Sequence, residues 1–176
     1  MTTTEPEWER RTAALWAAFD DHDAADFLGR MEALAAELPP GHPVAQFERA
    51  SARDSTGRPE QAAVLYRSAL DAGLTGSRRR QATIQLASTL RNLGRPEESV
   101  ALLTAERDDG SDDLDDAVAA FLALALVDTG REREAAALAL AALSRHLPRY
   151  SRSLTNYARA MATGPSPADT TGPGTA

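Results

Sequence analysis

The sequence predicts an all-α protein made of repeated helix-turn-helix units, and three observations lead to this fold class. A short pattern recurs, in which an alanine is followed seven residues later by a glycine and eight residues after that by a leucine. The three copies are Ala50, Gly57 and Leu65, then Ala87, Gly94 and Leu102, and then Ala123, Gly130 and Leu138. The glycines are 37 and 36 residues apart, a period typical of stacked helical units. In addition, 36 of the 176 residues are alanine, which favours helices, and no segment alternates as a strand would.

The N-terminal region predicts a pair of helices. Apolar residues at helical spacing form one stripe, which consists of Trp8, Leu15, Trp16 and Phe19 with Thr12 between them. An acidic break at residues 20–23 follows, and a second stripe runs through Leu28, Met31, Leu34 and Leu38. The two tryptophans lie eight residues apart on one helix face, which favours a place in the core over a ligand platform.

Proline and glycine mark the boundaries of the next helices. A Pro- and Gly-rich stretch at 39–43 ends the second helix, and the third helix runs to about Ser55. Gly57 tolerates the positive φ of a helix C-terminus, and Pro59 suits the first turn of the helix that follows. Gly94 and Pro96 repeat the same arrangement, so we expect the two turns to share one design.

The C-terminal part predicts an apolar helix, a further helix and a cap. Residues 108–116 form an acidic boundary, and the apolar run 117–127 predicts a buried helix because it is too short to span a bilayer. Another helix ends near His146, and a last amphipathic segment follows Pro148. Its outer face carries Arg149, Arg152 and Arg159, as a terminal capping helix requires. We count nine helices in one domain, residues 1–162, and expect a disordered tail at 163–176 because it lacks periodicity.

Composition excludes several classes of protein and site. The net charge of −7 argues against nucleic acid or an anionic membrane as partner, because both would repel the average surface. The chain has no cysteine, which excludes disulfides, thiolate metal sites and cysteine nucleophiles and fits a reducing compartment. Residues 1–10 are polar and acidic and lack the apolar core of a signal peptide. We therefore expect a cytoplasmic protein.

The repeated unit resembles the tetratricopeptide repeat. In the best unit a small residue, the turn glycine, an alanine and an aromatic residue match that pattern at Ala50, Gly57, Ala62 and Tyr66. The first unit matches less well, with Asp21 where glycine is expected. More closely, four stretches are similar to the small bacterial tetratricopeptide repeat group 5 family: YRSALDAGL (66–74), QLASTLRNLGRPEES (85–99), FLALALVDTGREREA (121–135) and LPRYSRSLTNYA (147–158).

This resemblance covers about residues 40–160 and implies both an architecture and a class of function. The expected architecture is a right-handed superhelical stack of about four helix-turn-helix units, an α-solenoid, closed by the capping helix. The family serves protein interaction and carries no established chemistry, so the resemblance implies a non-catalytic scaffold or adaptor. The first helix of each unit would line a concave surface that binds a peptide or protein segment.

One polar stripe is the candidate binding face. Gln81, Gln85, Ser88 and Asn92 share one face of a helix, whereas the opposite side is apolar. The candidate peptide-binding residues are Gln81, Ile84, Gln85, Ser88, Arg91 and Asn92, together with Phe47 and Ser51. They would bind an extended peptide or its terminal carboxylate, and the alternative is a solvated polar face. Domains of this family that clamp a carboxylate use lysine, which this chain lacks, so that clamp is not matched.

A run of three arginines is a candidate anion-binding site. Arg78, Arg79 and Arg80 follow Ser77, which is suited to be an N-cap, so the cations would lie in a first turn where the helix dipole disfavours them. The alternative is inter-helix salt bridging, to Glu60 or to aspartates of a neighbouring unit. An acidic peptide is the anion that this site would take.

The remaining motifs predict no catalytic site, metal or cofactor. The aspartates of residues 108–116 lack the spacing of a calcium loop and favour an acidic helix start. His22, His42 and His146 lie in three different turns with no partner at a recognisable spacing. We therefore predict a binding module and no enzyme. The alternatives are self-association as a homodimer through an exposed apolar face and, less favoured, a role as an enzyme subunit.

Overall fold

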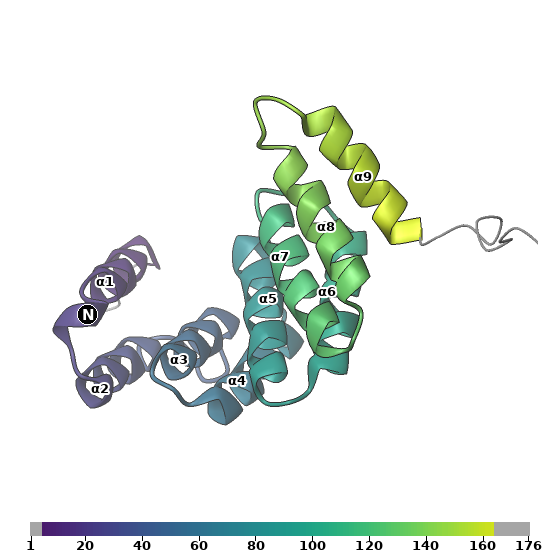
Figure 1. Ribbon diagram of the computed structural model, residues 1–176. Helices are drawn as coiled ribbons and strands as arrows, with labels where there is room; N and C mark the ends of the chain where they lie inside the picture. The colour runs from purple at the N-terminus through teal and green to yellow at the C-terminus, as the bar shows by residue number, and fades with distance from the viewer. Residues whose placement is uncertain (1–4, 164–176) are drawn as a thin grey trace, which may run out of the picture. The chain divides into compact units, whose positions relative to one another are not determined.

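The computed structural model describes residues 5–163 and contains only helices there, which confirms the predicted all-α class (Figure 1). The nine α-helices of this part of the chain are α1 (Glu5–Ala17), α2 (Ala24–Ala35), α3 (Pro43–Ser55), α4 (Pro59–Asp71), α5 (Gly76–Asn92), α6 (Pro96–Asp109), α7 (Asp115–Asp128), α8 (Glu132–Ser144) and α9 (Ser151–Thr163). A short 3-10 helix, η1 (Phe19–Asp21), follows α1. The predicted tail, apart from Thr163, lies outside the described residues.

The helices group into two compact units, one within residues 1–95 and the other within residues 96–176. In the first unit each helix from α1 to α5 packs against the next, and α3 also contacts α5. In the second unit α6, α7, α8 and α9 likewise pack in chain order. Neighbours in sequence are therefore neighbours in space within each unit, as stacked hairpins require. A single domain over residues 1–162 stays a prediction.

Aromatic side chains hold the N-terminal helices of the first unit together. Trp8 is buried, and its indole Nε1 donates a hydrogen bond to the Leu34 carbonyl, 2.8 Å away, which joins α1 to α2. Trp16 and Phe19 meet the buried ring of Phe27 edge-on, with ring centroids 5.0 and 4.7 Å from it. Trp8 therefore takes the predicted place in the core, whereas Trp16 packs on the core and remains partly accessible.

The turn after α1 departs from the glycine turns and explains the weak match of the first repeat. The 3-10 helix η1 occupies the place where the pattern expects glycine, so Asp21 needs no positive φ. Asp23 then caps α2, because its carboxylate accepts hydrogen bonds from the amides of Ala25 and Asp26 at 2.9 and 2.8 Å. The connection between α1 and α2 is therefore made by a 3-10 helix and a capped helix start, and no glycine turn is needed.

The glycine turns have the predicted design. Gly57 and Gly94 both have φ of 75°, a left-handed conformation that glycine adopts without steric cost. The amide of Arg58 donates to the Arg53 carbonyl at 2.8 Å, and that of Arg95 donates to the Leu90 carbonyl at 2.9 Å. These six-residue hydrogen bonds close the helix ends as Schellman motifs. Pro59 and Pro96 begin the helices that follow, as predicted.

Small residues and one carboxylate join the inner helices of the first unit. Ala50 on α3 and Ala87 on α5 are both fully buried, which permits the close approach that the sequence predicts. On α2, the Glu32 carboxylate accepts hydrogen bonds from Arg49 Nε at 2.9 Å and Arg53 Nη2 at 2.7 Å, both on α3. Burial raises the pKa of Glu32, but the two guanidinium groups outweigh that effect and leave the pKa below its usual range.

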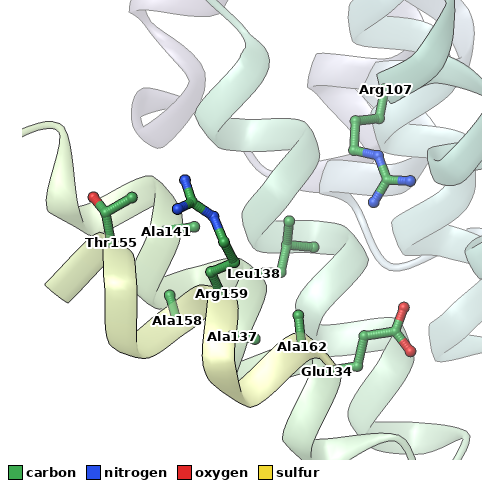
Figure 2. A pocket seen from close by; sticks show the side chains of 9 residues that line it. All are labelled: Arg107, Glu134, Ala137, Leu138, Ala141, Thr155, Ala158, Arg159 and Ala162. Carbon is green, nitrogen blue, oxygen red and sulfur yellow. The ribbon is translucent and has the colours of Figure 1, made fainter. Parts of the chain in front are cut away.

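In the second unit, the apolar residues of α6, α7 and α8 enclose a core, and α9 covers α8. Leu103, Leu122 and Leu126 are almost fully buried. Small side chains of α9 lie along α8 (Figure 2), and the Thr155 hydroxyl donates to Ser144 Oγ across the two helices at 2.9 Å. The prediction that α7 is a buried helix is only partly correct, because Leu124 and Val127 are about half exposed on its outer side.

Candidate functional site

A hollow of about 470 Å³ lies in the first unit between α1, α3 and α5. We call it the first-unit cleft. Its aromatic and charged lining consists of Trp16, Phe47, Glu48 and Arg78. Its neutral polar lining consists of three serines, Ser51, Ser55 and Ser77, and two amides, Gln81 and Gln85. The structure thus brings Phe47, Ser51, Gln81 and Gln85 of the predicted peptide-binding set into one hollow.

Helical spacing explains why these side chains meet. On α3, residues 47, 51 and 55 follow at intervals of four, and residue 48 lies three positions before 51, so all four lie on one side of the helix. On α5, residues 77, 81 and 85 follow at intervals of four and form a second polar row. Because α3 and α5 contact each other, the two rows form adjoining walls. Trp16 on α1 contributes to the third wall.

The rest of the predicted peptide-binding set lies outside the lining of this cleft. Ile84 is buried with 6% of its surface exposed, so it belongs to the core. Ser88, Arg91 and Asn92 continue the polar row of α5 beyond the end of the hollow, and of these Asn92 is exposed. The predicted stripe therefore exists on α5, but only its N-terminal half lines the first-unit cleft.

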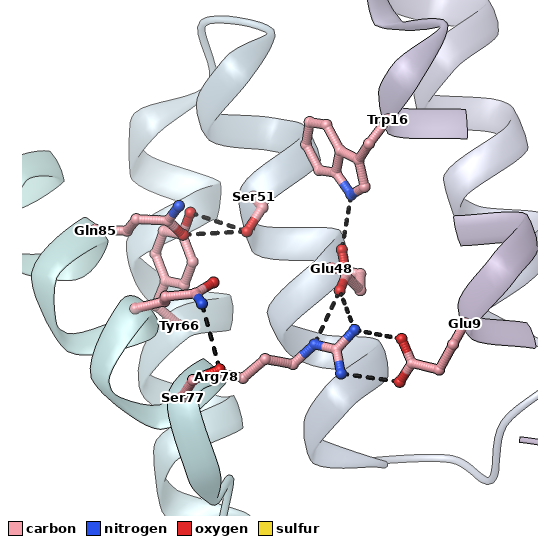
Figure 3. Close-up of polar contacts among 9 residues, drawn as sticks. Glu9, Trp16, Glu48, Ser51, Tyr66, Ser77, Arg78 and Gln85 are labelled. Atoms are coloured by element: carbon pink, nitrogen blue, oxygen red, sulfur yellow. Dashed lines mark hydrogen bonds and ion pairs between the residues drawn. The ribbon is translucent and has the colours of Figure 1, made fainter. Parts of the chain in front are cut away.

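Arg78 is held between two carboxylates from other helices (Figure 3). Its Nη1 and Nη2 donate to the two Glu9 oxygens of α1 at 2.8 and 2.6 Å, as a bidentate pair. Its Nε donates to Glu48 Oε1 of α3 at 3.2 Å, and its Nη2 lies 3.1 Å from the same oxygen. One guanidinium therefore connects α1, α3 and α5. The hydrogen bond to Glu9 raises the pKa of Arg78, and the charge of Glu48 adds to this effect. Burial lowers the pKa but does not outweigh them, so the pKa of Arg78 is raised.

Glu48 is the buried charge of the site. Its side chain is 5% exposed, and its second oxygen, Oε2, accepts a hydrogen bond from Trp16 Nε1 at 2.8 Å. Burial raises the pKa of Glu48 above its usual range, although hydrogen bonds and charge from Trp16 and Arg78 oppose the rise. Both carboxylate oxygens are therefore engaged by protein donors, and the charge is kept next to Arg78.

A second set of hydrogen bonds fixes the far wall of the cleft. Tyr66 donates from its hydroxyl to Ser51 Oγ at 3.3 Å, and Ser51 Oγ in turn donates to Gln85 Oε1 at 3.1 Å. Burial raises the pKa of Tyr66, so its hydroxyl stays protonated. Because the Gln85 oxygen is the acceptor in this pair, the Nε2 of the same side chain keeps its two N–H donors for another partner. The Gln81 amide makes a longer contact of 3.5 Å with Ser77 Oγ.

The three arginines of the run lie in different surroundings, and only Arg78 lines the first-unit cleft. Arg78 makes the inter-helix salt bridges that the sequence allowed as an alternative, but to Glu9 and Glu48 and not to Glu60. Arg79 and Arg80 do not line the cleft, and Arg80 is buried. The predicted N-cap at Ser77 is wrong, because α5 begins at Gly76 after Thr75. This start places the arginines from the third helical position onward.

Sequence reasoning missed the acidic partners of the cleft. Glu48 lies three positions before Ser51, so the face of α3 that carries Ser51 already contained it. An arginine at the start of α5 was a signal that a carboxylate on α3 or α1 faces it. Nothing local in the sequence indicates that Glu9, which is 69 residues away, forms an ion pair with Arg78.

Two histidines also have partners that the sequence did not indicate. His22 Nδ1 lies 2.7 Å from Asp26, and His146 Nε2 lies 2.6 Å from Asp116, which also contacts Arg145. Neither pair lines the first-unit cleft. Within residues 5–163, no group of three or more acidic or histidine side chains is arranged to hold a metal ion. In the same residues no helix combines the length and apolar character needed to cross a membrane.

Comparison with known proteins identifies a protein family. The family model described as a tetratrico peptide repeat, group 5, matches residues 43–161. Neither the search of curated proteins nor that of solved structures yields a match. The matched span begins at α3 and continues into α9, so it includes two of the three helices that line the first-unit cleft.

Proposed function

We propose that this chain, which belongs to the tetratricopeptide repeat family, is a non-catalytic interaction module that binds an extended protein segment in the first-unit cleft. Repeats of this family suggest partners that are proteins. The observation that carries the proposal is the cleft itself, in which aromatic edges and neutral hydrogen-bonding groups surround a hollow of about 470 Å³. Its size falls within the range of about 300–1,000 Å³ common for ligand pockets.

The polar groups of the cleft are suited to the backbone of a peptide. Amide and hydroxyl groups both donate and accept, as an extended main chain requires at alternate positions. The Nε2 donors of Gln85 are available for a carbonyl of the bound segment, because Ser51 engages the oxygen of the same amide. Trp16 and Phe47 supply apolar surface for a side chain.

The charges of the cleft argue against a terminal carboxylate as the anchor of the segment. Glu9, Arg78 and Glu48 together carry a formal charge of about −1, and the donors of Arg78 are directed at the two carboxylates. An incoming carboxylate would compete with them for the same guanidinium. We therefore favour a neutral or basic segment that is recognised through its backbone, and the anion-binding hypothesis for the arginine run is not part of this proposal.

A display experiment tests the proposal. Random peptides displayed on phage are selected against the full chain, and the enriched peptides are then titrated as synthetic, fluorescently labelled probes. Replacing both amides, in the variant Gln81→Arg/Gln85→Arg, fills the hollow and is expected to weaken binding at least about tenfold, a loss typical of a blocked central contact. The matched control is Asn92→Arg, which changes the same helix outside the hollow and should leave affinity within about twofold.

The result that would refute the cleft assignment is equally direct. If peptides selected on the full chain bind the blocked variant and the Asn92→Arg control with the affinity of the parent, while circular dichroism stays helical, the segment binds elsewhere. If the blocked variant loses helical signal, Gln85→Ala is measured in its place. This change removes the Nε2 donors without adding bulk and should still weaken binding.

Self-association is the second candidate, and one observation favours it. Tyr150, which directly precedes α9, and Tyr157 on α9 are 78% and 68% exposed, so this region offers aromatic surface to a second copy. Sedimentation at increasing concentration decides this point, since a dimer predicts a rise in mass that Tyr157→Ser abolishes. The cytoplasmic location expected from the sequence also remains part of this proposal.

A further inference from the structure

A second hollow, of about 330 Å³, lies entirely within the second unit, between α8 and α9 and the end of α6 (Figure 2). We call it the second-unit groove. Its floor is apolar and consists of Leu138 with the alanines 137, 141, 158 and 162. Because alanine carries nothing beyond Cβ, the helices leave room above these positions. The hollow has the volume of a small ligand site and would accept one bulky apolar side chain.

The rim of this groove is positive, although the chain as a whole carries a net charge of −7. Arg107 on α6 and Arg159 on α9 both line it, and Glu134 on α8 is the one acidic lining residue. Glu134 is already paired with Arg131, whose Nη2 lies 2.7 Å from its carboxylate. The two arginines, set against this one carboxylate, leave the rim with a net positive formal charge.

The two rim arginines are weakly engaged by the protein. Among residues 5–163, Arg107 forms an ion pair only with its neighbour in sequence, Asp108, at 3.2 Å. Both side chains are well exposed, so water competes for this pair. Within the described residues Arg159 makes no ion pair, and its side chain donates no hydrogen bond. By contrast, Thr155 at the end of the groove has its one hydroxyl proton engaged within the protein, because Ser144 Oγ and the Ser151 carbonyl both lie 2.9 Å from its oxygen. The rim groups that the protein engages least are thus the two arginines.

We propose that the second-unit groove binds a segment of a partner protein that combines a bulky apolar side chain with flanking carboxylates. The apolar side chain lies on the Leu138 and alanine floor between α8 and α9. The carboxylates pair with Arg159 on one side and with Arg107 on the other, where the planar guanidinium groups form bidentate hydrogen bonds. Charge complementarity selects the acidic class of segment, since a basic one would meet two arginines.

The site is independent of the first-unit cleft and takes the opposite class of segment. The cleft carries a buried carboxylate and a committed arginine, whereas the groove carries an apolar floor and weakly engaged arginines. A chain with two such sites would recognise two segments at once, each with its own charge. Failure of one site in an experiment therefore says nothing about the other.

The test uses the full chain with the first-unit cleft blocked by Gln81→Arg/Gln85→Arg, so that only other sites select peptides. Phage-displayed random peptides are enriched on this chain, and the most enriched sequence is synthesised with a fluorescent label. We expect enrichment of peptides that contain Asp or Glu beside a large aliphatic or aromatic residue. Fluorescence anisotropy then measures affinity against variants of the groove.

Two groove variants and one matched control decide the outcome. Arg159→Glu is expected to weaken binding of the acidic peptide by about tenfold or more, because it places like charges in contact. Ala141→Trp fills the groove and is expected to abolish saturable binding. The control, Arg152→Glu, makes the same charge change on α9 outside the groove lining and should alter affinity by less than about twofold.

Several results would overturn the proposal. The first is that the enriched peptides contain no acidic residues, and the second is that nothing is enriched over phage that display no peptide. The third is an equal loss of affinity with Arg152→Glu and Arg159→Glu, which would indicate attraction to net charge alone. A concentration-dependent mass that Arg159→Glu abolishes would also overturn it, since the groove would then hold a second copy of the chain. If Ala141→Trp loses helical signal, Leu138→Asp provides a second change of the floor.

Discussion

Replacing Arg78 with methionine, which keeps an unbranched apolar stem and removes the guanidinium group with its charge, is the most informative change in the first unit. The change leaves Glu48 buried, with 5% of its side chain exposed and Trp16 Nε1 as its remaining donor. Glu9 also loses its partner, but its side chain is 37% exposed and water replaces the contact. The cost therefore falls mainly on the buried carboxylate.

The magnitude follows from the burial of the three side chains. Removing one partner of a fully buried ion pair costs about 3–5 kcal/mol, whereas an exposed pair contributes about 0.2–1 kcal/mol. Arg78 is 30% exposed, so the network lies between these limits, and we expect a loss of about 2 kcal/mol at neutral pH. In a chain of this length, that loss lowers the melting temperature by about 4–8 °C.

The pH dependence provides a sharper test than the size of the loss. Because the folded pKa of Glu48 is already raised, the native state binds more protons than the unfolded state between the two pKa values, and stability falls as pH rises through that window. Without Arg78 the folded pKa rises further. The penalty of Arg78→Met should therefore be largest at neutral pH and should shrink as the pH is lowered and Glu48 becomes protonated.

Urea unfolding at several pH values, followed by circular dichroism, measures these differences. In a Glu48→Gln background the same substitution should cost less than about 1 kcal/mol, because no buried charge is left behind. Arg10→Met is the matched control, since Arg10 is an exposed residue on α1 that does not line the cleft. An equal loss in both backgrounds that does not change with pH would refute the assigned role of Glu48.

Three further predictions concern the fold. Ala87→Leu should overpack the seam between α3 and α5 and cost about 1–3 kcal/mol in urea unfolding; a neutral result would mean that the seam has space. Gly94→Ala should cost about 1–2 kcal/mol because φ is 75°, and the same change at Gly110, which has no positive φ, should be close to neutral in thermal unfolding. Glu32, whose pKa is lowered, stabilises the fold above its usual pKa, so Glu32→Gln should destabilise at neutral pH. This effect should vanish as the pH falls through the lowered pKa of the folded state. A loss from Glu32→Gln that persists in acid would contradict that assignment.

The sequence predicted the helices well because their signals are local. Glycine at Gly57 and Gly94 and proline two residues later specify a helix end and a helix start within a few residues, and both turns have the expected geometry. The turn after α1 did not match the repeat pattern because it lacks these local signals. A 3-10 helix and the cap by Asp23 replace the glycine, and these were not part of the repeat pattern.

The candidate site was only partly predictable because charge pairing is not local. The polar row of Gln81 and Gln85 follows from periodicity alone, and the structure places both in the cleft. The role of Arg78 depends on Glu9, which is 69 residues away in sequence, so the choice between anion binding and salt bridging needed the coordinates. Ile84 illustrates the limit of face assignment, since a shift of one position along a helix turned a predicted contact into a core residue.

Hydrogen–deuterium exchange of the full chain, with and without a peptide selected on it, tests most directly that the first-unit cleft is a binding site. The account predicts slower exchange at Pro43–Ser55 and Gly76–Asn92, the helices that carry the two polar walls, and no such protection in the Gln81→Arg/Gln85→Arg chain. Protection that is confined to helices outside the cleft, or that persists unchanged in the blocked chain, would contradict it.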